Sequence, residues 1–189
     1  MLKLVLALLL VLTPLASAHA ERSRRSREDQ RASLVMLLSA YELRLDRGGL
    51  ETIGPDVPTL LIDIANTPRE GPTMRTRALA ALAFYPDTTT KNFLASLLHE
   101  RSFEGTSFGR QLRRQAMRSF GKAFGDAAID ELLALKDDTD PLVREGVAIA
   151  LGDAASARAL PMLQTWLVNE SVFTVHAAID AACERLRRL

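Results

Sequence analysis

Apolar residues recur along most of this chain at the spacing of one buried helix face. The clearest stretch is residues 137–152. Its apolar positions are the first, fifth, eighth and ninth of a helix, Val143, Val147, Ala150 and Leu151. That spacing gives a single apolar stripe on a helix of 3.6 residues per turn. Asp140 and Pro141 precede the stripe, and an Asp cap followed by Pro at the first helical position is typical of a helix start.

Three further segments fit the same template. Aligned on this helix, the copies start at Met74, Leu112, Val143 and Val175, so that successive starts are 38, 31 and 32 residues apart. Such spacing is typical of a repeat made of two helices and their turns. The first helix of each repeat is expected at residues 57–65, 90–99, 127–135 and 159–168. Small residues let neighbouring second helices approach closely, and glycines 121, 125 and 152 are expected to end helices.

An amphipathic helix is also expected before the first full repeat, at residues 29–45. Its apolar residues are Leu34, Leu37, Leu38, Tyr41 and Leu45. One apolar face and one wet face suit a helix that caps the end of a stack. No segment has the alternation or the turns of paired strands. The predicted fold is all-α: a short α-solenoid, a right-handed superhelix of about four helix pairs with an N-terminal capping helix, over residues 29–189.

Over residues 56–188 the sequence resembles the HEAT-repeat family, particularly the short bacterial HEAT-like repeats also found in phycobilin lyases. In that family the Asp before the second helix and the Arg at its second position usually form structural contacts between repeats. The resemblance therefore implies this inter-repeat role for four residues, Asp140, Arg144, Arg113 and Arg75. The last copy departs from the pattern, because His176 stands where the other copies carry Arg.

The first twenty residues form a separate segment. Lys3 precedes an apolar run at residues 4–12, and small residues follow, with Ala18 and Ala20 at the −3 and −1 positions. This pattern predicts a secretory signal peptide at residues 1–20, cleaved after Ala20 or Ala18, and export to the periplasm or beyond. A flexible Arg/Ser-rich leader is expected at residues 21–28. Its arginines favour the alternative of an uncleaved anchor that keeps the chain in the cytoplasm.

Composition narrows the choice of partners. Removing residues 1–20 also removes Lys3 and leaves 23 basic and 23 acidic residues. A net charge near zero provides no overall field to gather nucleic acid or anionic lipid. Cys183 is the only cysteine and falls in line with Val175 and Ile179 on its helix. We therefore expect a buried thiol, with a disulfide between two chains as the alternative.

Candidate catalytic residues are scarce. The pair His99-Glu100 and the distant His176 do not assemble the ligand set of the HEAT-repeat iron hydroxylases. The sequence contains neither a nucleophile signature nor a Gly-rich phosphate loop. We therefore expect no enzymatic activity, no cofactor and no metal. A lyase-like enzyme or enzyme subunit is the alternative that the repeat class implies.

A basic stripe is the strongest surface feature. Its residues recur every four positions on one helix, over about 18 Å, and are Arg110, Arg114, Arg118 and Lys122. The stripe predicts a partner contact, and the alternative is a solvated face paired with acids such as Asp87 or Glu145. The charge does not recur in the other copies, which disfavours nucleic acid.

A second candidate contact is the loop at residues 102–108. It carries Phe103 and Phe108 between small polar residues, as a projecting contact or as side chains packed over the core. The predicted function is a non-catalytic interaction or scaffold module of the bacterial cell envelope. It would bind a protein or peptide on the concave surface of its second helices, with no nucleic-acid partner and no stable membrane insertion once the signal is cleaved.

Overall fold

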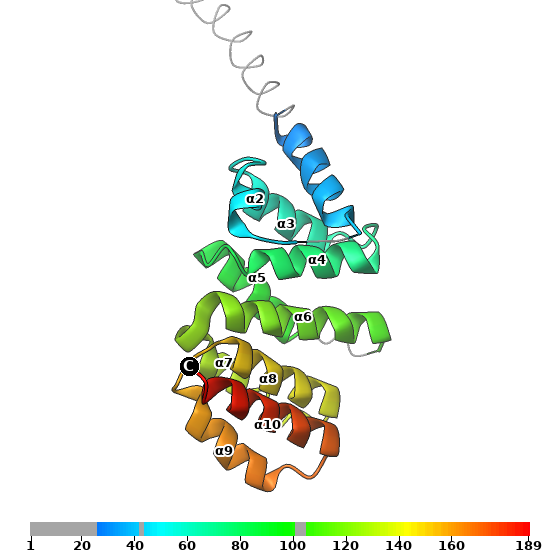
Figure 1. Ribbon diagram of the computed structural model, residues 1–189. Coiled ribbons are helices and arrows are strands. Elements are labelled where there is room, and N and C mark those ends of the chain that lie inside the picture. The colour runs from blue at the N-terminus through cyan, green and yellow to red at the C-terminus, as the bar shows by residue number, and fades with distance from the viewer. Residues whose placement is uncertain (1–25, 42–43, 101–104) are drawn as a thin grey trace, which may run out of the picture. The chain divides into compact units, whose positions relative to one another are not determined.

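A computed structural model describes residues 26–41, 44–100 and 105–189 of the chain (Figure 1). The predicted signal peptide with Ala18 and Ala20, most of the leader and Phe103 lie outside these residues. All regular structure in the described ranges is helical. The chain divides into two compact units, Met1–Val57 and Pro58–Leu189.

The first unit contains a helix at residues 26–39 and the short helix α2 (Arg47–Glu51). Its buried apolar residues include Leu34, Leu38, Leu50 and Val57. Gln30 connects the start of the long helix to the end of the unit. Its Oε1 accepts from the backbone N–H of Asp56 at 2.9 Å, and its Nε2 donates to Asp56 Oδ2 at 3.3 Å. These bonds satisfy an amide that is only 8% exposed.

The N-terminal helix differs from its prediction at both ends. The sequence predicts residues 29–45, but residues 26–28 of the predicted leader are already helical and the helix ends at residue 39. At that end the hydroxyl of Ser39 donates to the carbonyl of Val35 at 2.7 Å. Such bonds compete with the backbone ladder of a helix. Tyr41, predicted on the apolar face, is 98% exposed.

The second unit consists, over its described residues, of four helix pairs. The first helices are α3 (Val57–Asn66), α5 (Thr88–Leu98), the 3-10 turn η2 (Gly125–Ala128) continued by α7 (Ile129–Leu133), and α9 (Ala159–Asn169). The second helices are α4 (Pro72–Leu82), α6 (Ser107–Phe124), α8 (Pro141–Asp153) and α10 (Phe173–Leu186). The third first helix, predicted as continuous over residues 127–135, begins instead as a 3-10 turn and ends at Leu133.

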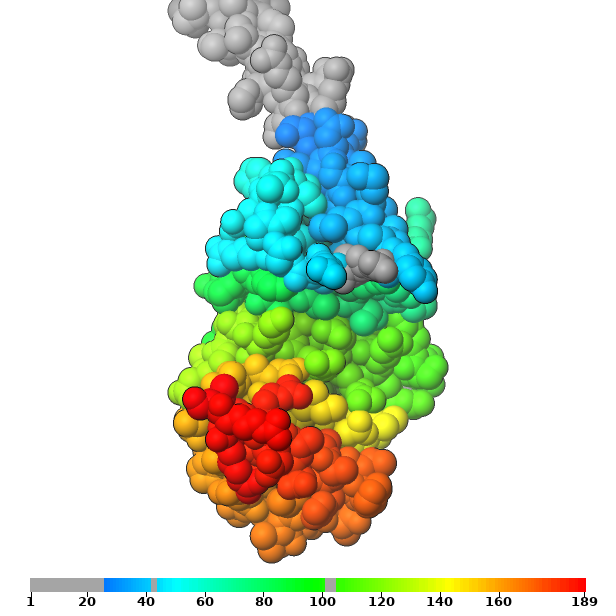
Figure 2. Space-filling model, viewed as in Figure 1, coloured from blue at the N-terminus to red at the C-terminus, as the bar shows by residue number. Residues whose placement is uncertain are grey.

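The second helices form one continuous layer. α4 packs on α6, α6 on α8 and α8 on α10, while α6, α8 and α10 each contact the first helix of their own pair (Figure 1). In Figure 2 the yellow, orange and red residues of the last two pairs lie together on one side of the green residues. Each pair therefore buries its apolar face against its neighbours, as stacked repeats require. This arrangement confirms the predicted all-α solenoid.

Glycines inside the second helices allow the close approach of this layer. The sequence predicts that Gly121 and Gly152 end helices, which is wrong for Gly121 inside α6 and correct to within one residue for Gly152, because α8 ends at Asp153. A Cβ on Gly121 would lie 2.3 Å from the carbonyl oxygen of Ala150, and one on Gly152 would lie 3.0 Å from the Cβ of Ala182. The next second helix occupies that space. Gly125 does cap α6, with φ +51.

Candidate partner-binding surface

The layer of second helices carries two adjoining hollows. One, of about 330 Å³, is lined by residues of α4, α6 and α8, and the other, of about 320 Å³, by residues of α8 and α10. Ile149 of α8 lines both. We call the two hollows together the second-helix groove. Each hollow has the size of a pocket for a small ligand or for part of a peptide, which is roughly 300–1,000 Å³.

Helix α6 brings most of the predicted basic stripe to this groove. Arg110, Arg114 and Arg118 line the first hollow. Lys122, one turn further on, lies instead with its Nζ 5.0 Å from the centroid of the Phe84 ring. The spacing of four residues places the side chains on one helix face, but only three of the four line the groove.

The groove arginines meet acids on α8. Arg114 Nη2 donates to Glu145 Oε1 at 2.7 Å, and Arg118 Nε donates to Asp153 Oδ2 at 2.8 Å. Arg185 of α10 bonds the other oxygen of Asp153. Glu145, named above as an acid that could pair with the stripe, therefore does pair with Arg114. The carboxylate of Asp87, the other acid named above, caps α5 by accepting from the N–H of residue 90 at 2.8 Å.

The arginines marked by the HEAT-like resemblance lie in the first half of the second helices. Each donates to a backbone carbonyl at or just after the end of the first helix of its own pair. The bonds are Arg75 Nε to Ala65 O at 2.7 Å, Arg113 Nε to Leu98 O at 2.7 Å, and Arg144 Nη1 to Asp138 O at 2.8 Å. Charged donors make strong hydrogen bonds, so each arginine fixes the turn between its two helices.

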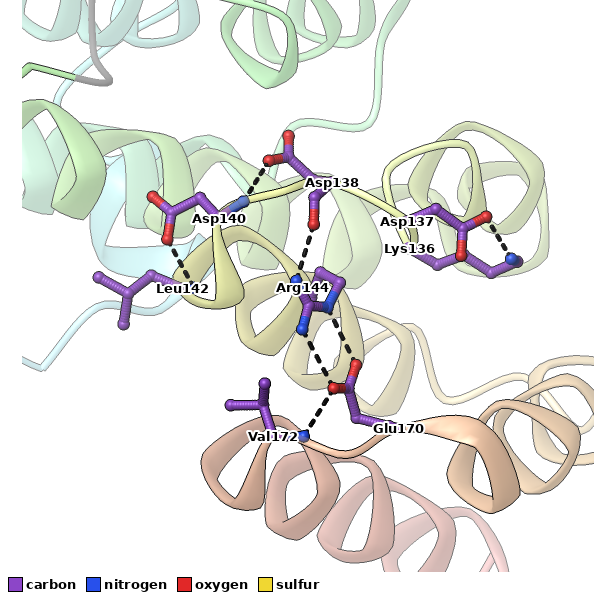
Figure 3. Close-up of polar contacts among 8 residues, drawn as sticks. All are labelled: Lys136, Asp137, Asp138, Asp140, Leu142, Arg144, Glu170 and Val172. Atoms are coloured by element: carbon purple, nitrogen blue, oxygen red, sulfur yellow. Dashed lines mark hydrogen bonds and ion pairs between the residues drawn. The ribbon is translucent and has the colours of Figure 1, made fainter.

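Two of these arginines also reach an acid in the next pair. Arg113 Nη2 lies 3.5 Å from Asp138 Oδ2, and Arg144 donates from Nε and Nη2 to both oxygens of Glu170 at 2.9 and 3.1 Å (Figure 3). Both acids stand two residues before the N-cap of a second helix and accept its N–H. Those bonds are Asp140 N to Asp138 Oδ1 and Val172 N to Glu170 Oε1, each at 2.9 Å. One arginine therefore joins the turns of consecutive repeats.

Asp140 acts within its own turn. Its Oδ1 accepts from the N–H of Leu142 at 2.9 Å, and Pro141 occupies the first helical position. Asp138, two residues earlier, is the acid that contacts the preceding repeat. In the last pair, His176 stands at the arginine position and is exposed.

Arg75 has a different contact in the next pair. Its guanidinium lies 5.3 Å from the centroid of the Phe108 ring, and desolvation lowers the pKa of Arg75. Phe108 belongs to the first turn of α6, which begins at Ser107. Phe108 therefore packs beside the repeat junction, as in the second of the two alternatives given above, and it lies in a helix instead of the predicted loop.

The electrostatics of the Arg144–Glu170 pair follow from its hydrogen bonds. The bonds from Arg144, followed by that from the N–H of Val172, lower the pKa of Glu170 from 4.5 to about 2. Bonding to Glu170 raises the pKa of Arg144. The side chains of Arg144 and Glu170 are 15% and 5% exposed. The pair is thus ionised near neutral pH and holds two repeats together.

A third hollow, of about 640 Å³, lies beside this pair, at the ends of α7 and α9. Arg144, Trp166 and Glu170 are among the residues that line it. Glu170 already accepts from Arg144, Val172 and Trp166. The charged groups here therefore bond mainly to one another, whereas the groove presents half-exposed arginines.

Catalytic and metal chemistry has few candidates in the described ranges. Among those residues, no three His, Cys, Asp or Glu side chains form a group that could hold a metal ion. His99 Nε2 lies 4.0 Å from Glu131 Oε1. Cys183 is fully buried, as predicted, and burial raises the pKa of its thiol. Over residues 26–41, 44–100 and 105–189, no helix has both the length and the apolar character needed to cross a membrane.

Comparison with known families agrees with this architecture. Residues 104–183, which include α6 to α9 and most of α10, match a family model described as HEAT repeats. The resemblance to HEAT repeats predicted from the sequence is thus confirmed over this part of the chain. Stacked repeats of this class commonly serve as surfaces for protein interaction. No curated protein matches the chain.

Proposed function

We propose that this protein is a non-catalytic interaction module that binds a protein or peptide along the second-helix groove. The main support is the pair of adjoining hollows that share Ile149 on one layer of stacked helices. Solenoids use such extended surfaces for binding. Arginine is enriched at the centres of protein interfaces, and here it lines the groove beside an apolar side chain.

The proposal includes a place of action in the bacterial cell envelope. Its support is the pattern of residues 1–20, with a basic start, an apolar core, and Ala18 and Ala20 before the expected cleavage site. Intact mass of the native protein from separate cell fractions tests this point. A soluble species that begins at Glu21 or His19 agrees with export. A full-length species in the membrane fraction contradicts it and directs the search for partners to the cytoplasm.

Site-specific photo-crosslinking tests the groove itself. A photoreactive phenylalanine analogue is placed at Ala178, which lines the second hollow, or at Gln164, which is exposed on α9 outside the groove. Irradiation of cells should give a defined adduct from position 178 and none from position 164. The change Ile149→Arg should abolish that adduct, because it adds a long charged side chain where the hollows meet.

The matched control is Val168→Arg, which adds the same side chain at a position that is 84% exposed and outside the groove. It should leave the adduct from position 178 unchanged. Equal adducts from positions 178 and 164, or an adduct that survives Ile149→Arg, would contradict binding in the groove.

A further inference from the structure

Asp153 receives two arginines from two different helices. Arg118 of α6 donates from Nε to Asp153 Oδ2 at 2.8 Å, and Arg185 of α10 bonds Oδ1 through Nη1. The side chain of Asp153 is 12% exposed, whereas those of Arg118 and Arg185 are 50% and 53% exposed. One shielded carboxylate is therefore shared by two guanidinium groups that face solvent. The cluster carries one unbalanced positive charge.

Most donors of these two arginines are available to a ligand. A guanidinium has five N–H groups in a planar fork that matches a carboxylate. Each of the two side chains makes one hydrogen bond in the described part of the chain, and both of these bonds go to Asp153. Anchoring by a largely buried acid holds the arginines in place before a ligand arrives, which reduces the entropy lost on binding.

The other ion pair of the groove also exposes its arginine more than its acid. This pair is Arg114 with Glu145, in which the arginine is 37% exposed and the acid 19%. In both contacts the acid is shielded and the arginine faces solvent. On the α10 side the groove is lined by small side chains, Ala177, Ala178 and Ala181. A partner backbone can thus approach closely beside a row of exposed positive charges.

From this geometry we infer that the groove selects an acidic peptide segment, and that Arg118 and Arg185 together bind one of its carboxylates. With the incoming carboxylate, two negative charges, one from the ligand and one from Asp153, balance the two positive charges of the arginines. This inference rests on the proposed function and adds the chemistry of the partner. A nucleic-acid backbone fits less well, because it needs positive charge along its length, whereas the second hollow is lined mainly by small apolar side chains and also by Glu145.

Fluorescence anisotropy with the purified full chain tests this inference. The probe is a fluorescein-labelled peptide of about twelve residues, roughly 40 Å when extended, in which Glu alternates with Ala. A second peptide carries Gln in place of every Glu. We expect the Glu peptide to bind at least about tenfold more tightly than the Gln peptide.

Two single variants locate the effect. Arg118→Gln leaves Asp153 with Arg185, and Arg185→Gln leaves it with Arg118, so the carboxylate keeps a partner and the fold is retained. Each variant removes the unbalanced charge. Each should weaken binding of the Glu peptide about tenfold and leave the Gln peptide unaffected. Thermal melting of each variant confirms that the fold is intact.

The chain provides a matched control in Glu184, which also lies between two arginines. Arg187 bonds one of its oxygens and Arg188 lies 3.9 Å from the other. This cluster is confined to one end of α10, and its acid is 50% exposed. Arg187→Gln changes the net charge as Arg118→Gln does, but it should alter affinity for the Glu peptide less than about twofold.

Four results would overturn the inference: no binding of the Glu peptide, equal binding of the Gln peptide, an equal loss in Arg187→Gln, or tighter binding of a single-stranded oligonucleotide. The last result would assign the groove to phosphate. None of these results contradicts the proposed function as an interaction module, because the crosslink from Ala178 to a partner is an independent measurement. Loss of that crosslink together with retained Glu-peptide binding would instead contradict the proposed function.

Discussion

Arg144 donates two hydrogen bonds to the carboxylate of Glu170, from Nε at 2.9 Å and from Nη2 at 3.1 Å. The two residues belong to consecutive helix pairs, and both side chains are largely buried. Arg144 also donates to the carbonyl of Asp138 in its own turn, as Figure 3 shows. This ion pair therefore joins the third and fourth pairs at their turns, in addition to the contact of Arg185 with Asp153 and the packing of α8 on α10.

This pair should make the stability of the protein depend on acid. The pKa of Glu170 is about 2 in the folded chain, against an ordinary value of 4.5. A lowered pKa stabilises the fold fully above about pH 4.5, and the effect is lost as the pH falls towards about 2. The shift corresponds to roughly 3 kcal/mol. We expect the free energy of unfolding in urea to fall between about pH 5 and pH 3, and to fall clearly less in Glu170→Gln.

Glu184→Gln is the control for this measurement, because the side chain of Glu184 is 50% exposed and its partners lie on its own helix or just beyond it. It should retain the acid dependence of the unmodified protein. If Glu170→Gln retains it as well, the stabilisation lost in acid comes from other carboxylates.

The glycines of the second-helix layer should differ sharply in their tolerance of alanine. In Gly121→Ala the new methyl would lie 2.3 Å from the backbone oxygen of Ala150, which cannot move without shifting α8. We expect a loss of about 1–3 kcal/mol or more. In Gly146→Ala the nearest atom is Met117 Sδ at 3.0 Å, at the end of a flexible side chain. Gain of helix propensity, about 1 kcal/mol, should offset most of that strain.

Urea unfolding of the two variants beside Gly105→Ala checks this order. No atom of the described residues lies within 4 Å of a Cβ on Gly105, so that variant should unfold within about 0.5 kcal/mol of the unmodified protein. Equal losses in Gly121→Ala and Gly146→Ala would show that α6 and α8 do not pack as closely as the structure indicates.

These glycines illustrate what could be predicted from the sequence. Apolar spacing gives the helix pairs, because burial on one face leaves a period of 3.6 residues. A glycine that ends a helix and one beneath a crossing helix look alike in one sequence, so Gly125 was predicted correctly and Gly121 wrongly. The helix α2 has no such period. Asp46 starts it by accepting from Gly49 N at 2.8 Å.

The residues of the groove could be predicted only in part, because the sequence shows what lies on one helix face but not which helices meet it. The stripe on α6 follows from spacing along one helix, but its partners lie on other helices. Asp153 and Arg185 come 35 and 67 residues after Arg118, and only the stacking of three repeats brings them together. The repeat register was the available signal, because one repeat separates Asp153 from each arginine.

A buried hydroxyl offers a route to a more stable protein. Thr90 of α5 is fully buried, and its Oγ1 has no hydrogen-bond partner among the described residues. An unpaired buried polar group is costly, and its replacement by an apolar group of the same shape removes that cost. Thr90→Val should raise the free energy of unfolding by about 1 kcal/mol. Thr89→Val, at an exposed neighbouring position, should change it by less than about 0.5 kcal/mol.

The contact between Arg114 and Glu145 determines how the basic stripe should be mutated. Arg114→Glu places two carboxylates where a 2.7 Å ion pair stood, so it should lower stability by about 1 kcal/mol besides changing the groove. Glu145→Arg should cost a similar amount. The double exchange restores opposite charges across α6 and α8, and it should recover most of both losses. Urea unfolding of the four proteins gives the coupling between the residues directly. Losses that simply add in the double exchange would mean that the two side chains do not interact in solution, and single charge reversals would then be a clean test of partner binding.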